Sequence, residues 1–194
     1  MVFLQENFWD ELIRQDRELL VQLNALGSKR WDPFWLFVTN QFNWIPLFLF
    51  LFFLLYKAYG KKKGIVLVLM AALLVAFSDQ LVNLIKNTVM RLRPNNDLEL
   101  KMIIRALKHP HGFSFVSGHA TTSFAVTVFM VLLLRKHYKY IVLLFLWPIF
   151  FAYSRIYCGV HFPVDIFIGM LLGIIIGLLF YKFCKMLLQK VYIS

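Results

Sequence analysis

The sequence is poor in charged residues, and its acidic residues are the scarcer kind. Only 16% of its 194 residues are Asp, Glu, Lys or Arg, whereas 60% are hydrophobic and 18% are aromatic. Soluble domains carry about 25% charged residues, and the mean hydropathy of this chain is +0.69. These values exclude an ordinary soluble domain and indicate an integral membrane protein.

The sequence also has few cysteines and no signal-peptide pattern. Cys158 and Cys184 lie in or beside apolar segments, and we expect them near opposite faces of the membrane, which excludes a disulfide between them. The first thirty residues carry charges of both signs instead of a basic start and an apolar centre. The first membrane span is therefore expected to direct the chain to the membrane.

No module that reads DNA or RNA is visible, although the net charge is +11. Many of the basic residues flank apolar segments, so lipid head groups and membrane orientation explain the excess, and no nucleic-acid partner is expected. The sequence has no repeat, low-complexity tract or flexible linker. We therefore expect one domain over residues 1–194, with an interfacial helix in 1–30 and a transmembrane bundle in 31–194.

The apolar segments predict an all-α, polytopic membrane helix bundle. Residues 3–26 place apolar side chains among charges at helical spacing, which is typical of an amphipathic helix lying in the membrane interface. Residues 95–117 form the longest polar segment and predict a surface loop with a short helix. A helix of about 20 residues crosses a hydrocarbon core of about 30 Å. About five membrane spans are expected, at residues 34–56, 64–85, 119–134, 140–157 and 163–181.

The distribution of charge predicts the orientation of these spans. Five alternating spans leave ten Lys and Arg residues and no acidic side chain on one side of the membrane. The other side receives the remaining eleven basic residues and all ten acidic ones. Short, purely basic loops favour the cytoplasm. The N-terminal helix, the long loop and three polar clusters would then face outward.

The first polar cluster ends the second apolar segment. Lys86 and Arg93 are seven residues apart and share a helix face if the helix continues to Pro94. An Arg fork and a Lys point charge suit the oxygens of a phosphate group. The alternative is that Lys86, Arg91 and Arg93 only extend to lipid head groups at the end of a span.

The second cluster precedes the third expected span. The Ser117 hydroxyl, the Gly118 amide and the helix N-terminus can converge on an anion, and His119 can protonate a leaving oxygen from the first turn. The alternative is a capping serine followed by an incidental interfacial histidine. His109 and His111 are interpreted as solvated loop residues, with an exposed metal site as the less favoured alternative.

The third cluster gives the sharpest signal. Ser154-Arg155 is followed by His161 and, four residues later, by Asp165. A neutral imidazole is nucleophilic toward phosphorus, and a carboxylate can fix its tautomer and stabilise the imidazolium. Pro163 is expected to open the last helix, with Asp165 in its first turn. The alternative is a histidine at the membrane edge beside a helix-capping aspartate.

Together the clusters resemble the three-part signature of the type 2 phosphatidic acid phosphatase superfamily: KxxxxxxRP, PSGH and SRxxxxxHxxxD. The first part is complete over residues 86–94 and the third over residues 154–165. The second, at residues 117–119, departs at Val116, which replaces the proline of the family and removes no chemical group. The chain is thus similar to this superfamily over most of its length.

The resemblance implies roles for individual residues. His161 would be the nucleophile that forms a phosphohistidine, Asp165 would orient it, and His119 would protonate the leaving group. The reaction would need no metal and no other cofactor. The resemblance also implies a phosphate-binding set: Lys86, Arg93, Ser117, Gly118 and Arg155.

The resemblance further implies a lipid phosphate or diphosphate substrate that stays in the bilayer. Small bacterial members act on undecaprenyl pyrophosphate, phosphatidylglycerophosphate or lipid A; undecaprenyl pyrophosphate is slightly favoured here, with phosphatidylglycerophosphate, phosphatidate and lipid A as alternatives. The expected location is the bacterial cytoplasmic (inner) membrane, with the active site facing the periplasm or cell exterior. Phosphotransfer to an acceptor other than water, and the oligomeric state, stay open.

A different class of function is a lipid transporter or flipping protein. Asp79, Asn83 and Lys86 fall on one face of a span, as polar residues along a transport path would. Five spans without an internal repeat make this alternative less attractive. A vanadate-dependent haloperoxidase would use the same residues, but the resemblance implies a soluble protein in that case, which conflicts with the membrane spans.

Overall fold

The computed structural model describes the backbone of residues 8–193 and the side chains of residues 8–189. This part of the chain folds into helices and contains no strand. The all-α prediction is therefore confirmed. Four short 3₁₀ helices, Gln41–Trp44, Pro94–Asn96, Leu100–Met102 and Lys139–Phe145, accompany six α-helices: α1 (Phe8–Ala25), α2 (Asp32–Thr39), α3 (Ile45–Val89), α4 (Gly118–Leu134), α5 (Leu146–Tyr157) and α6 (Pro163–Ile193).

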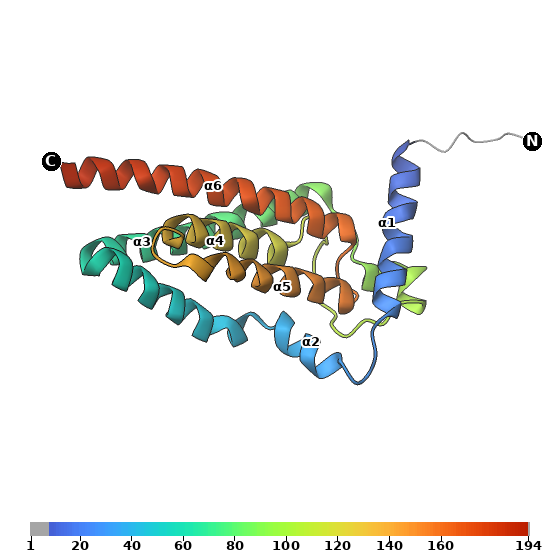
Figure 1. Cartoon of the computed structure of the whole chain (residues 1–194). Helices are drawn as coiled ribbons and strands as arrows, with labels where there is room; N and C mark the ends of the chain where they lie inside the picture. The colour runs from blue at the N-terminus through green and yellow to red at the C-terminus, as the bar shows by residue number, and fades with distance from the viewer. Residues whose placement is uncertain (1–7, 194) are drawn as a thin grey trace, which may run out of the picture.

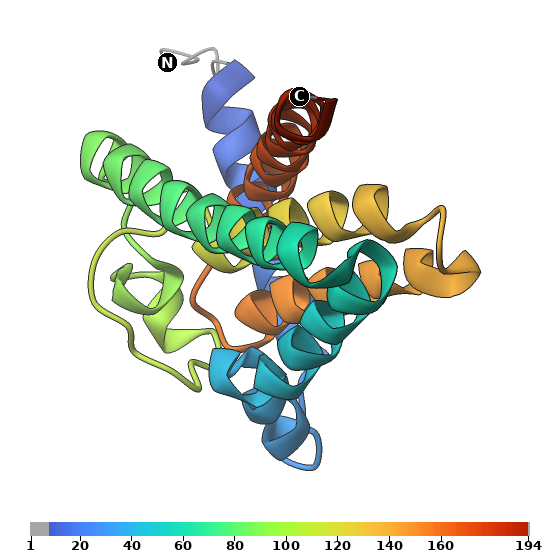
Figure 2. The ribbon, with the colours of Figure 1, turned by 90° about the vertical axis from the view of Figure 1, so that its left-hand side faces the viewer.

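Helix α3 is two apolar limbs joined by a turn. Gly60 adopts φ +74° and ψ 174°, a conformation that glycine reaches without a steric cost. Figure 2 shows the limbs, residues 45–59 and 61–89, diverging from this turn. By length and composition, three helical stretches of the described chain could cross a membrane, Gln41–Met102, Lys139–Tyr157 and Pro163–Gln189, and Gly118–Leu134 is a shorter apolar helix. Counted with both limbs of α3, these stretches correspond to the five expected apolar segments.

The prediction of one continuous span over residues 34–56 is wrong. The chain is extended at Asn40 (φ −84°, ψ 112°), whose side chain accepts a hydrogen bond from Phe42 N. The side-chain amide of Asn43 donates to the carbonyl of Phe37 at 2.8 Å. These side chains compete for backbone groups that a continuous helix would pair. The segment therefore divides into α2, a 3₁₀ turn and the first limb of α3.

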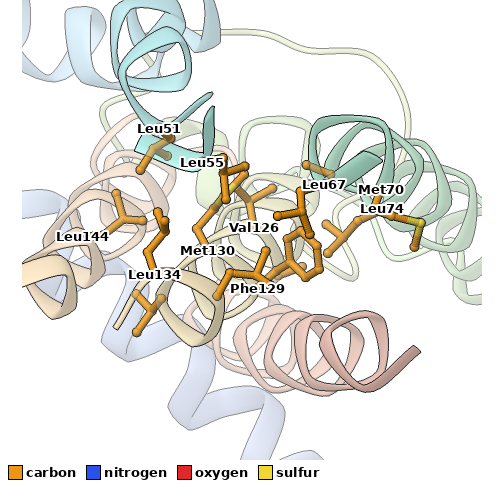
Figure 3. Close-up of a cluster of buried hydrophobic side chains, with 14 of the residues drawn as sticks. Leu51, Leu55, Leu67, Met70, Leu74, Val126, Phe129, Met130, Leu134 and Leu144 are labelled. Atoms are coloured by element: carbon orange, nitrogen blue, oxygen red, sulfur yellow. The ribbon is translucent and has the colours of Figure 1, made fainter. Parts of the chain in front are cut away.

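Helix α4 occupies the centre of the bundle and is buried on nearly all sides. Its Phe129 and Met130 are fully buried. Figure 3 shows them beside leucines from both limbs of α3, including Leu55 and Leu67. A helix that is apolar all round is expected in such a buried position. The surface of the surrounding helices carries many exposed large apolar residues, as a lipid-facing surface does.

Glycines on α6 let this helix approach α4 closely. A Cβ atom on Gly169 would lie 2.9 Å from the carbonyl oxygen of Ser117, and one on Gly177 would lie 2.7 Å from that of Ala125. A Cβ atom on Gly173 would collide with the carbonyl oxygen of Thr121. Small residues at every fourth position bring membrane helices into backbone contact. This contact holds the N-terminus of α4 against the first turns of α6.

Helix α1 lies crosswise at one end of the bundle, as Figure 1 shows, and it begins at Phe8. The part of the predicted interfacial helix before residue 8 lies outside the described residues. Leu20 of α1 packs with Ile156 and Phe162 of the connection between α5 and α6. The loop that follows α3 lies at this same end, whereas the turn of α3 and the C-terminal end of α6 lie at the opposite end (Figure 1).

Candidate active site

The three polar clusters meet in one cavity of about 580 Å³. The limbs of α3, the N-terminus of α4, helix α5 and the loop before α6 all contribute to its wall. Six of the eight residues of the sequence-predicted site are among the residues that line it: Lys86, Arg93, Gly118, His119, Arg155 and His161. Asp165 and Ser117 complete the predicted site from behind this wall, where both are fully buried.

His161 lies between two groups with opposite hydrogen-bonding character. Its Nε2 atom is 3.1 Å from Nη1 of Arg93, and its Nδ1 atom is 3.4 Å from Oδ2 of Asp165. A guanidinium nitrogen can only donate, so Nε2 accepts and the ring proton belongs on Nδ1, facing the carboxylate. In this tautomer the Nε2 lone pair lies on the side of the cavity, where it accepts from Arg93. The expected pairing of His161 with Asp165 is present in the structure.

Burial and neighbouring cations keep His161 neutral. Its side chain is 2% exposed, and burial is the largest cause that holds its pKa well below the usual range. The positive charges of Arg155, Arg93 and Lys86 act in the same direction. A neutral imidazole retains the lone pair that a nucleophile needs.

Asp165 stands in the first turn of α6, which begins at Pro163 as predicted. Its Oδ2 atom accepts a hydrogen bond from Phe162 N at 3.0 Å. Its Oδ1 atom accepts one from Nη1 of Arg91 at 2.8 Å. The helix N-terminus favours a carboxylate at this position, so the backbone, a guanidinium and the imidazole all face the same buried carboxyl group.

The prediction that Lys86 and Arg93 share a face of one continued helix is wrong, although both reach the cavity. Helix α3 ends at Val89, because Met90 adopts a left-handed conformation (φ 51°, ψ 31°) and its N–H bonds the carbonyl of Lys86. Arg93 is extended and turns back into the site. Its Nε donates to the carbonyl of Gly112 and its Nη1 to that of Val160, both at 3.1 Å.

Arg155 is buried at the C-terminal end of α5, where its Nη1 donates to the Thr39 hydroxyl at 2.6 Å. Within the described part of the chain, its Nε atom is buried and has no hydrogen-bond partner. An unpaired donor of a buried cation costs free energy until an acceptor arrives. Arg155 therefore retains a donor for an anion in the cavity. Thr39 was visible in the sequence only as a polar residue in an apolar segment.

The N-terminus of α4 combines a cap with two cavity-lining residues. The Ser117 hydroxyl accepts a hydrogen bond from Ala120 N, which is the capping role that the sequence left open as an alternative. Gly118 and His119 line the cavity. The ring of His119 stacks on Phe151 with 4.6 Å between the ring centroids. Val116, in place of the family proline, is buried and leaves this cap intact.

The exposed His109 and His111 take no part in this cavity wall. Among the residues that the structure describes, no group of three or more His, Cys, Asp or Glu side chains is placed to hold a metal ion. Cys158 and Cys184 are both buried free thiols.

The cavity wall also contains apolar side chains and further polar ones. Phe48 of the first limb of α3, Val75 of the second limb and Trp147 of α5 give it apolar walls. Asn83 and Asp79 line it about one and two turns before Lys86, and the amide of Asn83 donates to Asp79 at 3.1 Å. The cavity thus offers cationic, uncharged polar and apolar side chains to whatever occupies it.

Comparison with known proteins agrees with this arrangement. The model of the PAP2 superfamily matches residues 64–188. A lipid A 4'-phosphatase of Bacteroides thetaiotaomicron is 33% identical over 171 residues, which cover 86% of this chain and 75% of the relative. An undecaprenyl-diphosphatase of Sulfolobus acidocaldarius is 31% identical over 135 residues, 69% of this chain and 60% of that protein.

A solved structure shares the fold. The PAP2-type phosphatidylglycerolphosphate phosphatase of Bacillus subtilis superposes with a TM-score of 0.73 at 20% identity, covering 91% of this chain and 87% of that one. The matched residues 64–188 contain all three signature segments that meet in the cavity. The chain therefore belongs to the PAP2 superfamily.

Proposed function

We propose that this protein is a membrane phosphatase that removes phosphate from a lipid through a covalent intermediate on His161. The observation that carries the proposal is the cavity itself, in which two imidazoles and three cationic side chains face one space with apolar walls. The two relatives are named as phosphatases of lipid phosphates, which supports the same class of reaction.

In the proposed first step, Nε2 of His161 attacks phosphorus while the bond from phosphorus to the lipid oxygen breaks. His119, which takes up a proton when the anionic phosphate occupies the cavity, gives this proton to that oxygen, so the lipid leaves as an alcohol or, from a diphosphate, as a monophosphate. In the second step, His119 accepts a proton from water, the water oxygen attacks phosphorus, the bond from phosphorus to Nε2 of His161 breaks, and inorganic phosphate leaves. Asp165 orients the ring of His161 and stabilises its positive charge.

The phosphate group would be held by charge and by directed donors. Lys86, Arg93 and Arg155 bring positive charge to the cavity and stabilise charge that spreads over the phosphate oxygens. The Gly118 amide lies at the N-terminus of α4, a position that favours anions. A hydroxyl can accept and donate at once, so Ser117 can cap the helix and still donate to a phosphate oxygen. No step in this scheme requires a metal ion.

The proposed substrate is a phosphate monoester on the sugar of a lipid, as in the 4'-phosphate of lipid A. The relative named for that activity matches more of this chain than the undecaprenyl-diphosphatase does. The polar residues of the cavity wall support the same choice, because Asp79, Asn83 and Gln41 offer hydrogen bonds to sugar hydroxyls. An isoprenyl diphosphate has no hydroxyls to bind there. Undecaprenyl pyrophosphate, slightly favoured on sequence, becomes the second candidate.

We further propose that the chain is one domain in a bacterial cytoplasmic membrane, with the cavity at the outer face. The purely basic connections, at the turn of α3 and between α4 and α5, lie at the end away from α1 (Figure 1). Basic loops favour the cytoplasmic side. A cavity at the opposite end would receive a lipid head group from the outer leaflet.

The test is a comparison of substrates on purified protein. Phosphate release is measured from lipid A, undecaprenyl pyrophosphate, phosphatidylglycerophosphate and phosphatidate under one detergent condition, with His161→Gln as the control. Lipid A is expected to give the highest kcat/KM, and protein quenched in alkali should carry base-stable, acid-labile phosphate on His161. Preference for undecaprenyl pyrophosphate would overturn the substrate choice. Turnover that survives His161→Gln would overturn the mechanism, and lipid movement without phosphate release would favour the transporter.

A further inference from the structure

A chain of buried charges connects the N-terminal helix with the candidate nucleophile. It runs from Asp16 on α1 through Arg91, just after α3, to Asp165 and His161. Resting on the proposed function, we propose that Asp16 and Arg91 are positioning residues for the Asp165–His161 pair, which makes α1 part of the active site. Neither is among the described residues that line the cavity, so both would act through Asp165.

Arg91 is held on both edges and on one face. Its Nη1 donates to Oδ1 of Asp165 at 2.8 Å, and its Nη2 donates to Oδ2 of Asp16 at 2.6 Å. Its guanidinium carbon lies 3.8 Å from the centre of the Phe162 ring. The other oxygen of Asp16 accepts from Val164 N, in the first turn of α6, at 2.8 Å. Asp16 therefore fixes both the guanidinium and the backbone that carries Asp165.

The burial of these charges separates them from ordinary surface ion pairs. The side chains of Asp16 and Asp165 are 2% and 0% exposed, and that of Arg91 is 22% exposed. By contrast, Arg14 and Glu18 form an ion pair on the same helix with both side chains more than half exposed. Exposed pairs contribute little to stability, whereas buried charges carry a desolvation cost that their pairing must offset. Two carboxylates around one guanidinium are therefore a costly way merely to attach a helix.

The geometry assigns a consequence to this arrangement. Asp165 directs Oδ1 to Arg91 and Oδ2 toward Phe162 N and Nδ1 of His161. A carboxylate fixed at one oxygen cannot rotate, so the other oxygen stays aimed at the imidazole. That in turn keeps the Nε2 lone pair directed at the cavity. Without Asp16, Arg91 would lose one of its two partners, and the plane of the Asp165 carboxylate would be less restrained.

Helix α1 has other attachments, so its docking can be separated from this role. Arg17 binds Asp97 at 2.9 Å, and Asn24 donates to the carbonyl of Tyr157 at 3.0 Å. Leu20 is fully buried against Ile156. Asp16→Asn keeps the size of the side chain and an oxygen that can accept from Val164 N. We therefore expect this variant to keep α1 in place while it weakens the hold on Arg91.

The test measures kcat and KM for Asp16→Asn, Arg91→Gln and the double variant, with Glu18→Gln as the matched exposed control. Groups that orient a functional histidine through a second residue typically matter by about 10- to 100-fold. We expect kcat to fall by about tenfold for Asp16→Asn and by about 100-fold for Arg91→Gln, with KM within about twofold. The double variant should be no worse than Arg91→Gln alone, because Asp16→Asn keeps an acceptor for Val164 N and changes only the hold on Arg91.

Three outcomes would overturn this proposal: Asp16→Asn behaving like Glu18→Gln, a rise in KM at constant kcat, or additive effects in the double variant. Should Arg91→Gln fail to fold, Arg91→Lys takes its place in the cycle. A readout without turnover is the ¹⁵N NMR shift of the His161 ring, which is expected to move in Asp16→Asn and not in Glu18→Gln. Wild-type protein that releases no phosphate would refute the proposed function, while an unmoved shift would refute the positioning role.

Discussion

Replacing Asp165 with Asn should stop the proposed reaction while the protein stays folded. The carboxylate accepts from Arg91 at Oδ1 and from Phe162 N at Oδ2, and Oδ2 also faces Nδ1 of His161. An amide has one accepting oxygen and one donating nitrogen, so it cannot serve both sides. If its oxygen faces Arg91, its NH₂ faces the imidazole and favours the tautomer with the proton on Nε2. That tautomer has no lone pair on Nε2 and points a proton at the Arg93 donor.

The magnitude follows from these contacts. A wrong-tautomer substitution of this kind lowers kcat by about 10⁴ in a histidine–aspartate pair, which corresponds to about 5.5 kcal/mol at the transition state. The cost in stability is smaller, because Arg91 keeps its contact with Asp16. One unsatisfied buried donor costs about 1 to 3 kcal/mol. Activity and stability should therefore fall by clearly different amounts.

The assay is single-turnover formation of the phosphohistidine, measured together with the thermal midpoint in detergent. Asp97→Asn is the matched control, because Asp97 also accepts from two backbone amides, of Glu99 and Leu100, and from the guanidinium of Arg17, away from the cavity. The control should lose stability and retain its rate of phosphorylation. A loss of less than about tenfold for Asp165→Asn, at matched stability, would refute the role assigned to this carboxylate.

Three further predictions concern other parts of the molecule. The imidazole of His161 should titrate below about pH 6.5, because burial lowers its pKa, and it should therefore stay neutral as the pH falls to that value. NMR titration of the wild type, with His161→Gln to assign the signal, checks this, and a midpoint above about pH 6.5 would contradict it. Asp79→Ala should raise KM for lipid A by about tenfold and leave the turnover of undecaprenyl pyrophosphate unchanged, as kinetics measured in parallel would show. Equal effects on both substrates would refute the proposed contact between Asp79 and a sugar hydroxyl. Gly173→Leu should force α6 away from α4 and lower the thermal midpoint, at a cost in stability of about 1 to 3 kcal/mol. The control Leu179→Ala, on the exposed face of α6, should leave the midpoint unchanged, and equal midpoints for the two variants would contradict the close contact.

Local sequence signals predicted the parts of the site that depend on short stretches of chain. Pro163 opens α6 and Asp165 falls in its first turn, because the absence of a proline N–H and the helix dipole act within a few residues. His161 and Asp165 are only four residues apart, so their pairing also depends on a short stretch of chain. The apolar segments likewise indicated the helices, since a membrane leaves few other options for the backbone.

The parts that escaped the sequence depend on distant segments. Arg93 reaches the cavity from an extended chain held by Gly112 and Val160, and no periodicity could reveal those partners. Asp16 looked like any charge on an amphipathic helix, yet it is buried against α6. The available signal was that Asp16 lies on the expected apolar side of the helix. This position indicates a buried ion pair only once a partner such as Arg91 is known.

The charges of the cavity wall explain why an anion belongs there. Before substrate binds, when neither histidine is counted as charged, three cations of the cavity wall face one carboxylate, that of Asp79, which is also hydrogen-bonded to Asn83. This leaves an excess of about two positive charges in a space partly removed from water, where Coulomb interactions are strong. A phosphate monoester brings between one and two negative charges near neutral pH and so balances the excess. A diphosphate would balance it as well, so charge selects the phosphate, and the uncharged polar residues of the cavity wall must select the rest of the substrate.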